Sequence, residues 1–184
     1  MRTRNELVSK LELYASAFAE EMEFKDAFLK LLKEDRCFHR DHLPGHITGS
    51  VFIIDETGSH ALLTHHAKLN RWLQPGGHAD GDENVLQVAL REAEEETGLS
   101  EFKLLGDGLF DIDIHTIPAR PDFPEHQHYD IRFLLQANRH DQLLISEESH
   151  NLAWVPFDEL ATLTANDSIG RMLTKVQSSK LASS

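Results

Sequence analysis

The chain has 184 residues, of which 40% are hydrophobic, and its formal net charge is −13 at pH 7. This length suits one domain with an appendage, no apolar run approaches the roughly 18 residues of a membrane span, and the negative charge argues against binding to nucleic acid polymers or anionic membranes. The single cysteine, Cys37, cannot form an internal disulfide, and the first residues lack the apolar core of a signal peptide. We therefore expect a cytoplasmic protein.

The first 35 residues predict two helices. One apolar set repeats at helical spacing (Leu7, Leu11, Ala15, Phe18), and a second set follows it (Phe24, Ala27, Phe28, Leu31, Leu32). Residues 19–23 fit either a turn between the helices or a continuous helix. We expect residues 1–40 to form a helical extension that caps the main domain, residues 41–184, or contacts another subunit in a homodimer.

The next elements are two strands. Residues 46–55 predict a strand with a buried apolar stretch at 51–54, residues 55–58 have the composition of a turn, and residues 61–64 predict the returning strand of a hairpin. Arg71 and Trp72 then precede a Pro-Gly-Gly break at residues 75–77. They are either loop residues or part of a substrate pocket, because a cation and an aromatic ring suit phosphate and base.

A helix is predicted from Val85 to Thr97, a stretch without Gly or Pro, and Gly98 supplies its C-terminal stop. Leu86, Ala89, Leu90 and Ala93 share the arc that we expect to be buried.

Glu92, Glu95 and Glu96 lie on a neighbouring arc of this helix. At ~5 Å and an effective dielectric near 20, each pair of carboxylates repels by about 3 kcal/mol, which a divalent cation would reverse. Oxygen ligands suit Mg²⁺ or Mn²⁺, and Arg91 is placed to hold one carboxylate. The alternative interpretation is a solvated acidic helix face.

The wider pattern favours the metal site. It consists of Gly77, five residues, Glu83, seven residues, and then Arg91, Glu92, Ala93, Glu95, Glu96, Gly98 and Leu99 at fixed spacing. This pattern resembles the complete box of the Nudix hydrolases.

The resemblance implies an α/β/α sandwich of the Nudix type with a mixed β-sheet, to which the N-terminal helices are added. It also implies metal-dependent hydrolysis of a diphosphate linkage in a nucleoside diphosphate derivative. Glu92, Glu95 and Arg91 would then be catalytic, and Mg²⁺ or Mn²⁺ would be held by Glu92, Glu95, Glu96 and the Gly77 carbonyl. The resemblance assigns no particular phosphoanhydride substrate, and a catalytically silent domain that binds nucleotides or regulates remains the alternative.

Further strands are predicted at residues 102–105, 110–117, 128–136 and 152–155, and helices near 156–160 and 169–176. Asp111, Asp113 and His115 alternate with apolar residues, which is typical of a half-buried strand with a polar outer face.

His126, His128 and Asp130 share one strand face if that strand begins at His126. They either point into the cleft beside the box helix, where they would bind substrate or add a metal ligand, or form the solvent face of an edge strand. Glu147 and Glu148 in the following loop are alternatives to a box glutamate as the general base.

Overall fold

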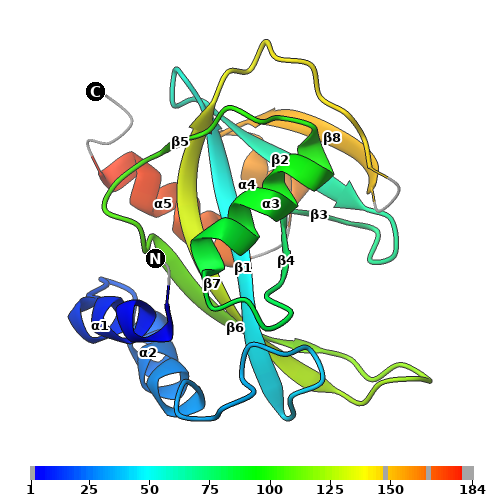
Figure 1. Ribbon diagram of the computed structural model, residues 1–184. Coiled ribbons are helices and arrows are strands. Elements are labelled where there is room, and N and C mark those ends of the chain that lie inside the picture. The colour runs from blue at the N-terminus through cyan, green and yellow to red at the C-terminus, as the bar shows by residue number, and fades with distance from the viewer. Residues whose placement is uncertain (1–2, 147–148, 165–166, 180–184) are drawn as a thin grey trace.

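The computed structural model describes residues 3–146, 149–164 and 167–179, and a single mixed sheet forms its centre (Figure 1). The strands are β1 (Gly45–Asp55), β2 (His60–His66), β3 (Arg71–Leu73), β4 (Gly76–His78), β5 (Lys103–Leu104), β6 (Asp111–Ile117), β7 (His126–Ala137) and β8 (Ser149–Pro156). The helices are α1 (Arg4–Leu13), α2 (Ala19–Leu31), α3 (Val85–Thr97), α4 (Leu160–Leu163) and α5 (Asp167–Ser178).

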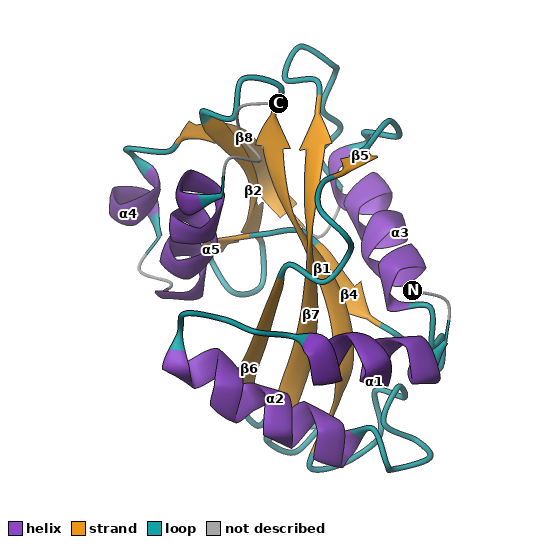
Figure 2. Cartoon of the chain, turned by 90° about the vertical axis from the view of Figure 1, so that its left-hand side faces the viewer, coloured by secondary structure: helices purple, strands orange, loops and turns teal. Residues whose placement is uncertain are grey.

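The sheet is mixed because β1 pairs in parallel with β7 and antiparallel with β2 and β4. Strand β6 pairs antiparallel with the other edge of β7, so β7 is an internal strand. Helix α3 covers one face of the sheet, α4 and α5 cover the other, and α1 and α2 lie across one end (Figure 2). This arrangement confirms the predicted α/β/α sandwich with added N-terminal helices.

Strand β1 is buried on both faces, which explains its continuous apolar run. Val51 and Ile53 belong to the core under α1, α2 and α3, whereas Phe52 and Ile54 belong to the core under α4 and α5. The sheet therefore separates two apolar layers.

Helix α3 has the predicted bounds, and Gly98 ends it in the left-handed region at φ 74°. The predicted buried face is partly wrong, because Leu86 and Leu90 are only half-buried while Val85 and Val88 are fully buried. The helix packs closely on β1 at Gly49, where an added Cβ would lie 2.9 Å from Val85. This close approach turns the Val85 side of α3 towards the sheet.

The two N-terminal helices are present, but their junction lies earlier than the 19–23 segment. Residues 14–18 connect the helices, so Ala15 and Phe18 are not in the first helix as their spacing indicated. Ser16 offers a local alternative to helix, because its hydroxyl accepts a hydrogen bond from the Phe18 amide at 3.1 Å. Apolar residues of both helices, including Leu7 and Phe28, belong to the same core cluster as α3 and β1; a boundary at residue 40 stays a prediction.

Two segments near the box are more regular than predicted. Gly76 and Gly77 do not interrupt the sheet but form β4, and Arg71 and Trp72 lie in β3. An added Cβ at Gly76 would overlap Ser50, so only glycine allows β4 to approach β1 this closely. Among the described residues, no helix is long and apolar enough to cross a bilayer.

Candidate active site

A cleft of about 1830 Å³ lies between α3, β4, the β6–β7 face and the β3 region. Its lining includes ten of the residues predicted from the sequence: Arg71, Trp72, Gly77, Arg91, Glu92, Glu95, Glu96, His126, His128 and Asp130. Segments far apart in the sequence are thus brought to one cavity. The roles of these residues remain predictions.

The carboxylates of α3 meet the backbone of β4 inside this cleft. Glu96 Oε1 accepts a hydrogen bond from the Gly76 amide at 3.2 Å. An added Cβ at Gly77 would lie less than 3.0 Å from the carboxylate of Glu92. Gly77 therefore leaves space that the Glu92 carboxylate uses, and the Gly76 amide orients Glu96.

Arg91 fixes the orientation of Glu92. Its Nη2 atom donates to Glu92 Oε1 at 2.7 Å and to the His78 carbonyl at 3.3 Å. Its Nε atom lies 3.8 Å from Glu95 Oε1, and the hydrogen bond to Glu92 raises the pKa of Arg91. Arg91 thus links the box helix to β4.

The donor set fits a hard divalent cation. The side chain of Glu92 is 19% exposed and that of Glu95 is 64% exposed, so the group extends from the cleft wall to solvent. Carboxylate and carbonyl oxygens, with open positions for water, are the ligands that Mg²⁺ and Mn²⁺ prefer. Gly77 lines the same cleft, so its carbonyl is available as a further oxygen ligand of this kind.

Trp72 and Arg71 form another part of the wall. The Trp72 ring stacks on His65 of β2 with 5.0 Å between centroids and an interplanar angle of 20°. Arg71, the neighbouring residue at the start of the same short strand, is exposed. The pair thus combines an oriented aromatic ring with an exposed cation at the cleft rim.

The face of β7 that carries His126, His128 and Asp130 also lines the cleft. The interpretation as an edge strand is wrong, because β1 and β6 flank β7. Asp130 is 3% exposed and accepts hydrogen bonds from Thr48 and Ser50 of β1 at 2.9 and 2.7 Å. Its carboxylate is therefore held within the protein.

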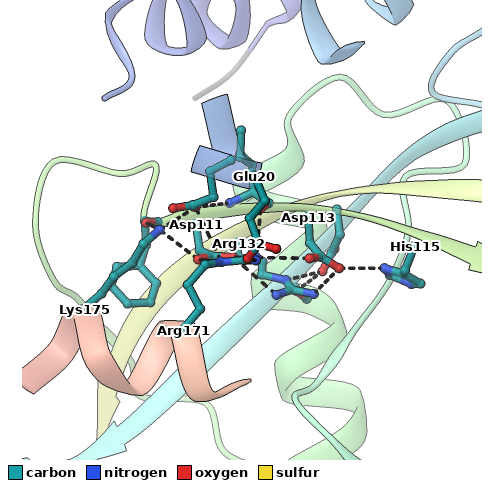
Figure 3. A network of polar contacts seen from close by, with 12 residues as sticks. Glu20, Asp111, Asp113, His115, Arg132, Arg171 and Lys175 are labelled. Atoms are coloured by element: carbon teal, nitrogen blue, oxygen red, sulfur yellow. Dashed lines mark hydrogen bonds and ion pairs between the residues drawn. The ribbon is translucent and has the colours of Figure 1, made fainter. Parts of the chain in front are cut away.

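The expected solvent-facing strand at residues 111–117 is instead buried at its start. Asp111 is 0% exposed and Asp113 is 8% exposed. Both belong to an ion-pair network with Arg132 of β7 and Arg171 of α5 (Figure 3). The predicted alternation of polar and apolar residues is present, but α2 and α5 cover the polar face, and Arg171 and Lys175 of α5 supply positive charges to its carboxylates.

Several residues in or near the cleft were not predicted from the sequence. Arg132 and Arg171 line the cleft, and His46 and His78 lie close to His128. Thr48 and Ser50 are polar residues in the first half of a buried strand, which is a local signal that this segment faces a polar site. Glu147 and Glu148 lie outside the described residues.

Comparison with known proteins identifies the family. A NUDIX domain model matches residues 45–176. A probable DHNTP pyrophosphohydrolase of Lactococcus lactis subsp. cremoris (strain MG1363) is 36% identical over 87 residues, which are 46% of this chain and 46% of that protein. An asymmetrical bis(5'-nucleosyl)-tetraphosphatase of Rattus norvegicus is 29% identical over 96 residues, 52% of this chain and 62% of that protein. The matches thus span about half the length of these curated relatives.

Solved structures share the fold at low identity. A C. elegans Ap4A hydrolase superposes with a TM-score of 0.58 at 20% identity, over 71% of this chain and 94% of that one. The E. coli dihydroneopterin triphosphate pyrophosphohydrolase gives a TM-score of 0.58 at 17% identity, over 70% and 92% of the two chains. These structures share the fold, and the NUDIX domain match over residues 45–176 shows that the chain belongs to the NUDIX family.

Proposed function

We propose that the protein is a metal-dependent hydrolase of a phosphoanhydride linkage in a nucleoside diphosphate derivative. The observation that carries the proposal is the convergence of Glu92 and Glu96 on the glycine backbone of β4 in a large cleft. A solvated acidic helix face would need neither this convergence nor the Arg91 bridge to Glu92.

Glu92, Glu95, Glu96 and the Gly77 carbonyl would hold Mg²⁺ or Mn²⁺. When bound, the cation supplies charge neutralisation for the phosphates and lowers the pKa of a coordinated water. Arg91 positions Glu92, and one of the box glutamates accepts a proton from the attacking water. Glu147 or Glu148 is the alternative base.

The other walls suit the rest of such a substrate. Trp72 offers a ring for stacking against a base, and Arg71 offers a cation for phosphate. His126 and His128 would add hydrogen bonds from the opposite side of the cleft. The relatives are named for the hydrolysis of DHNTP and of a bis(5'-nucleosyl)-tetraphosphate. These names support a nucleoside or pterin polyphosphate as the substrate class.

A substrate screen tests this proposal. Wild-type protein and Glu96→Gln are incubated with nucleoside triphosphates, dinucleoside polyphosphates, nucleotide sugars and a pterin triphosphate, each with Mg²⁺ or Mn²⁺. The proposal predicts products of anhydride cleavage with at least one substrate in the wild type and their loss in the variant. Tight nucleotide binding without turnover on any substrate would instead identify a silent binding domain.

We also propose that the protein acts in the cytoplasm, on the basis of its composition and its single buried cysteine. A homodimer through the N-terminal helices remains part of the proposal, and the mass of the protein in solution tests it.

A further inference from the structure

Three imidazoles from three neighbouring strands meet at one point of the sheet. His46 of β1 lies opposite His128 of β7 in the parallel pair, and His78 of β4 lies on the other side of β1. The ring centroids are 5.0 Å apart for His46 and His128, 4.9 Å for His78 and His128, and 5.3 Å for His46 and His78. One ring nitrogen from each residue lies within 4.8 Å of the other two.

Two of these imidazoles have a buried nitrogen without a protein partner. Within residues 3–146, 149–164 and 167–179, neither His46 Nε2 nor His128 Nε2 has a hydrogen-bond partner. His46 is only 1% exposed, so bulk water does not solvate it. An unpartnered buried polar atom costs about 1–3 kcal/mol, and in native proteins it calls for an unseen ion or water.

The hydrogen bonding of His46 leaves its unpartnered Nε2 atom unprotonated, with a lone pair available. Its Nδ1 atom lies 3.3 Å from the His42 carbonyl, which can only accept a hydrogen bond. The Nδ1 atom therefore carries the proton, and Nε2 is free to donate its lone pair to a metal. A backbone carbonyl that fixes the tautomer in this way is the usual support for a histidine ligand.

We propose that His46, His78 and His128 form a binding site for a late first-row divalent ion of the Zn²⁺ class, separate from the carboxylates of α3. Imidazole nitrogen suits Zn²⁺, Co²⁺ and Cu²⁺, whereas Mg²⁺ prefers oxygen. A tetrahedral Zn²⁺ with bonds of about 2.0–2.1 Å needs nitrogens about 3.3 Å apart, so modest side-chain rotations bring the three nitrogens into place.

The fourth position of this site opens towards the substrate cleft. His78 and His128 line the same cavity as Glu92 and Glu96. Three neutral ligands leave the charge of the ion uncompensated, so water, hydroxide or a phosphate oxygen is favoured at the open position. The site would thus add a cation beside the same cleft.

Metal binding tests the proposal without reference to activity. Metal-free full-length protein is titrated with Zn²⁺ by calorimetry in excess Mg²⁺, which competes at the carboxylates, and with Co²⁺ by visible absorption. We expect one Zn²⁺ per chain and the intense absorption of nitrogen-rich, low-coordinate Co²⁺. His46→Gln and His128→Gln should each weaken Zn²⁺ binding by about tenfold or more, and His140→Gln, at an exposed surface histidine, should not.

Box-glutamate variants separate this proposal from the function proposed above. Glu96→Gln should keep the Zn²⁺ site and its Co²⁺ spectrum whether or not the chain hydrolyses an anhydride. If buried His46→Gln does not fold, His78→Gln and His128→Gln, which are only half-buried, carry the test. Zn²⁺ binding that disappears in Glu96→Gln but persists in the histidine variants would overturn the site, and no Zn²⁺ binding in the wild type would show that water alone satisfies the two nitrogens.

Discussion

Arg171 of α5 donates two hydrogen bonds to the carboxylate of Asp111 in β6, from Nε to Oδ2 at 3.0 Å and from Nη2 to Oδ1 at 2.8 Å. Both side chains are buried, and Lys175 adds a contact to the same carboxylate at 2.8 Å. Glu21 of α2 accepts from Lys175 at 2.5 Å. The network therefore ties the N-terminal and C-terminal helices to the sheet beside the cleft (Figure 3).

Asp111→Asn should make stability at acid pH less sensitive to protonation. Burial alone would raise the pKa of Asp111, but the hydrogen bond from Arg171 and the charges of Arg132 and Lys175 outweigh it and lower the pKa. The unfolded chain, with a pKa of about 3.9, therefore binds the proton first as pH falls, so the carboxylate stabilises fully above about pH 4 and loses this contribution below it.

Urea unfolding at pH 7, 5, 4 and 3.5 measures this effect. At pH 7 the variant should lose about 3–5 kcal/mol, because buried cations lose their partner, and the gap to the wild type should narrow below pH 4. Asp41→Asn, which removes an exposed partner of Arg36, should leave the free energy of unfolding nearly unchanged, because solvent screens an exposed ion pair. A gap for Asp111→Asn that is constant at every pH would contradict the role of this carboxylate.

Phe28→Ala should destabilise the whole domain rather than the N-terminal helices alone. Phe28 is 0% exposed and its ring meets Tyr129 of β7 edge-on at 5.3 Å. Removing a buried phenylalanine costs about 3–5 kcal/mol. Leu13→Ala, at a side chain that is 86% exposed, is the matched control and should leave the melting temperature unchanged. Equal melting temperatures for both variants would show that α2 is dispensable for the core.

Cys37 should be unreactive in the folded protein. It is fully buried, and burial raises the pKa of its thiol to about 11. At pH 8 only about one thiol in a thousand would be ionised even if reagent reached it. A disulfide reagent should therefore label the native chain slowly and the urea-unfolded chain at once, and equal labelling rates would contradict the packing around α2 and β1.

Features set by residues near in sequence, such as helix bounds, could be predicted, whereas features that depend on the pairing of distant strands could not. The bounds of α3 follow from residues 85–98 alone, because helix length, cap and stop are local features. The convergence of His46, His78 and His128 depends on strand register across 82 residues of sequence, which no local pattern encodes. The burial of Asp111 likewise depends on Arg171, 60 positions away. The buried face of α3 includes Val85 and Val88 rather than Leu86 and Leu90, because the close approach of the helix to Gly49 of β1 turns the Val85 side towards the sheet.

Gly77→Ala should impair the site with little effect on the fold. The new Cβ would displace the Glu92 carboxylate, which is the flexible end of a side chain rather than backbone. We expect Mn²⁺ affinity to fall by about tenfold or more, with a change of less than about 1 kcal/mol in stability. Gly170→Ala, where an added Cβ meets open space, should alter neither metal binding nor hydrolysis. Wild-type Mn²⁺ affinity in Gly77→Ala would contradict a metal site built from the Glu92 carboxylate beside Gly77.

The cleft-facing glutamates of α3 should carry the proposed metal-dependent hydrolysis. Glu96→Gln and Glu94→Gln each remove one carboxylate from the same helix, but Glu96 lines the cleft whereas Glu94 is exposed. Mn²⁺ binding and hydrolysis of the best substrate should be measured on the same preparations of both variants and the wild type. We expect a loss of about 100-fold or more in both quantities for Glu96→Gln and wild-type values for Glu94→Gln. Equal values for the two variants would show that the cleft-facing carboxylate has no special role.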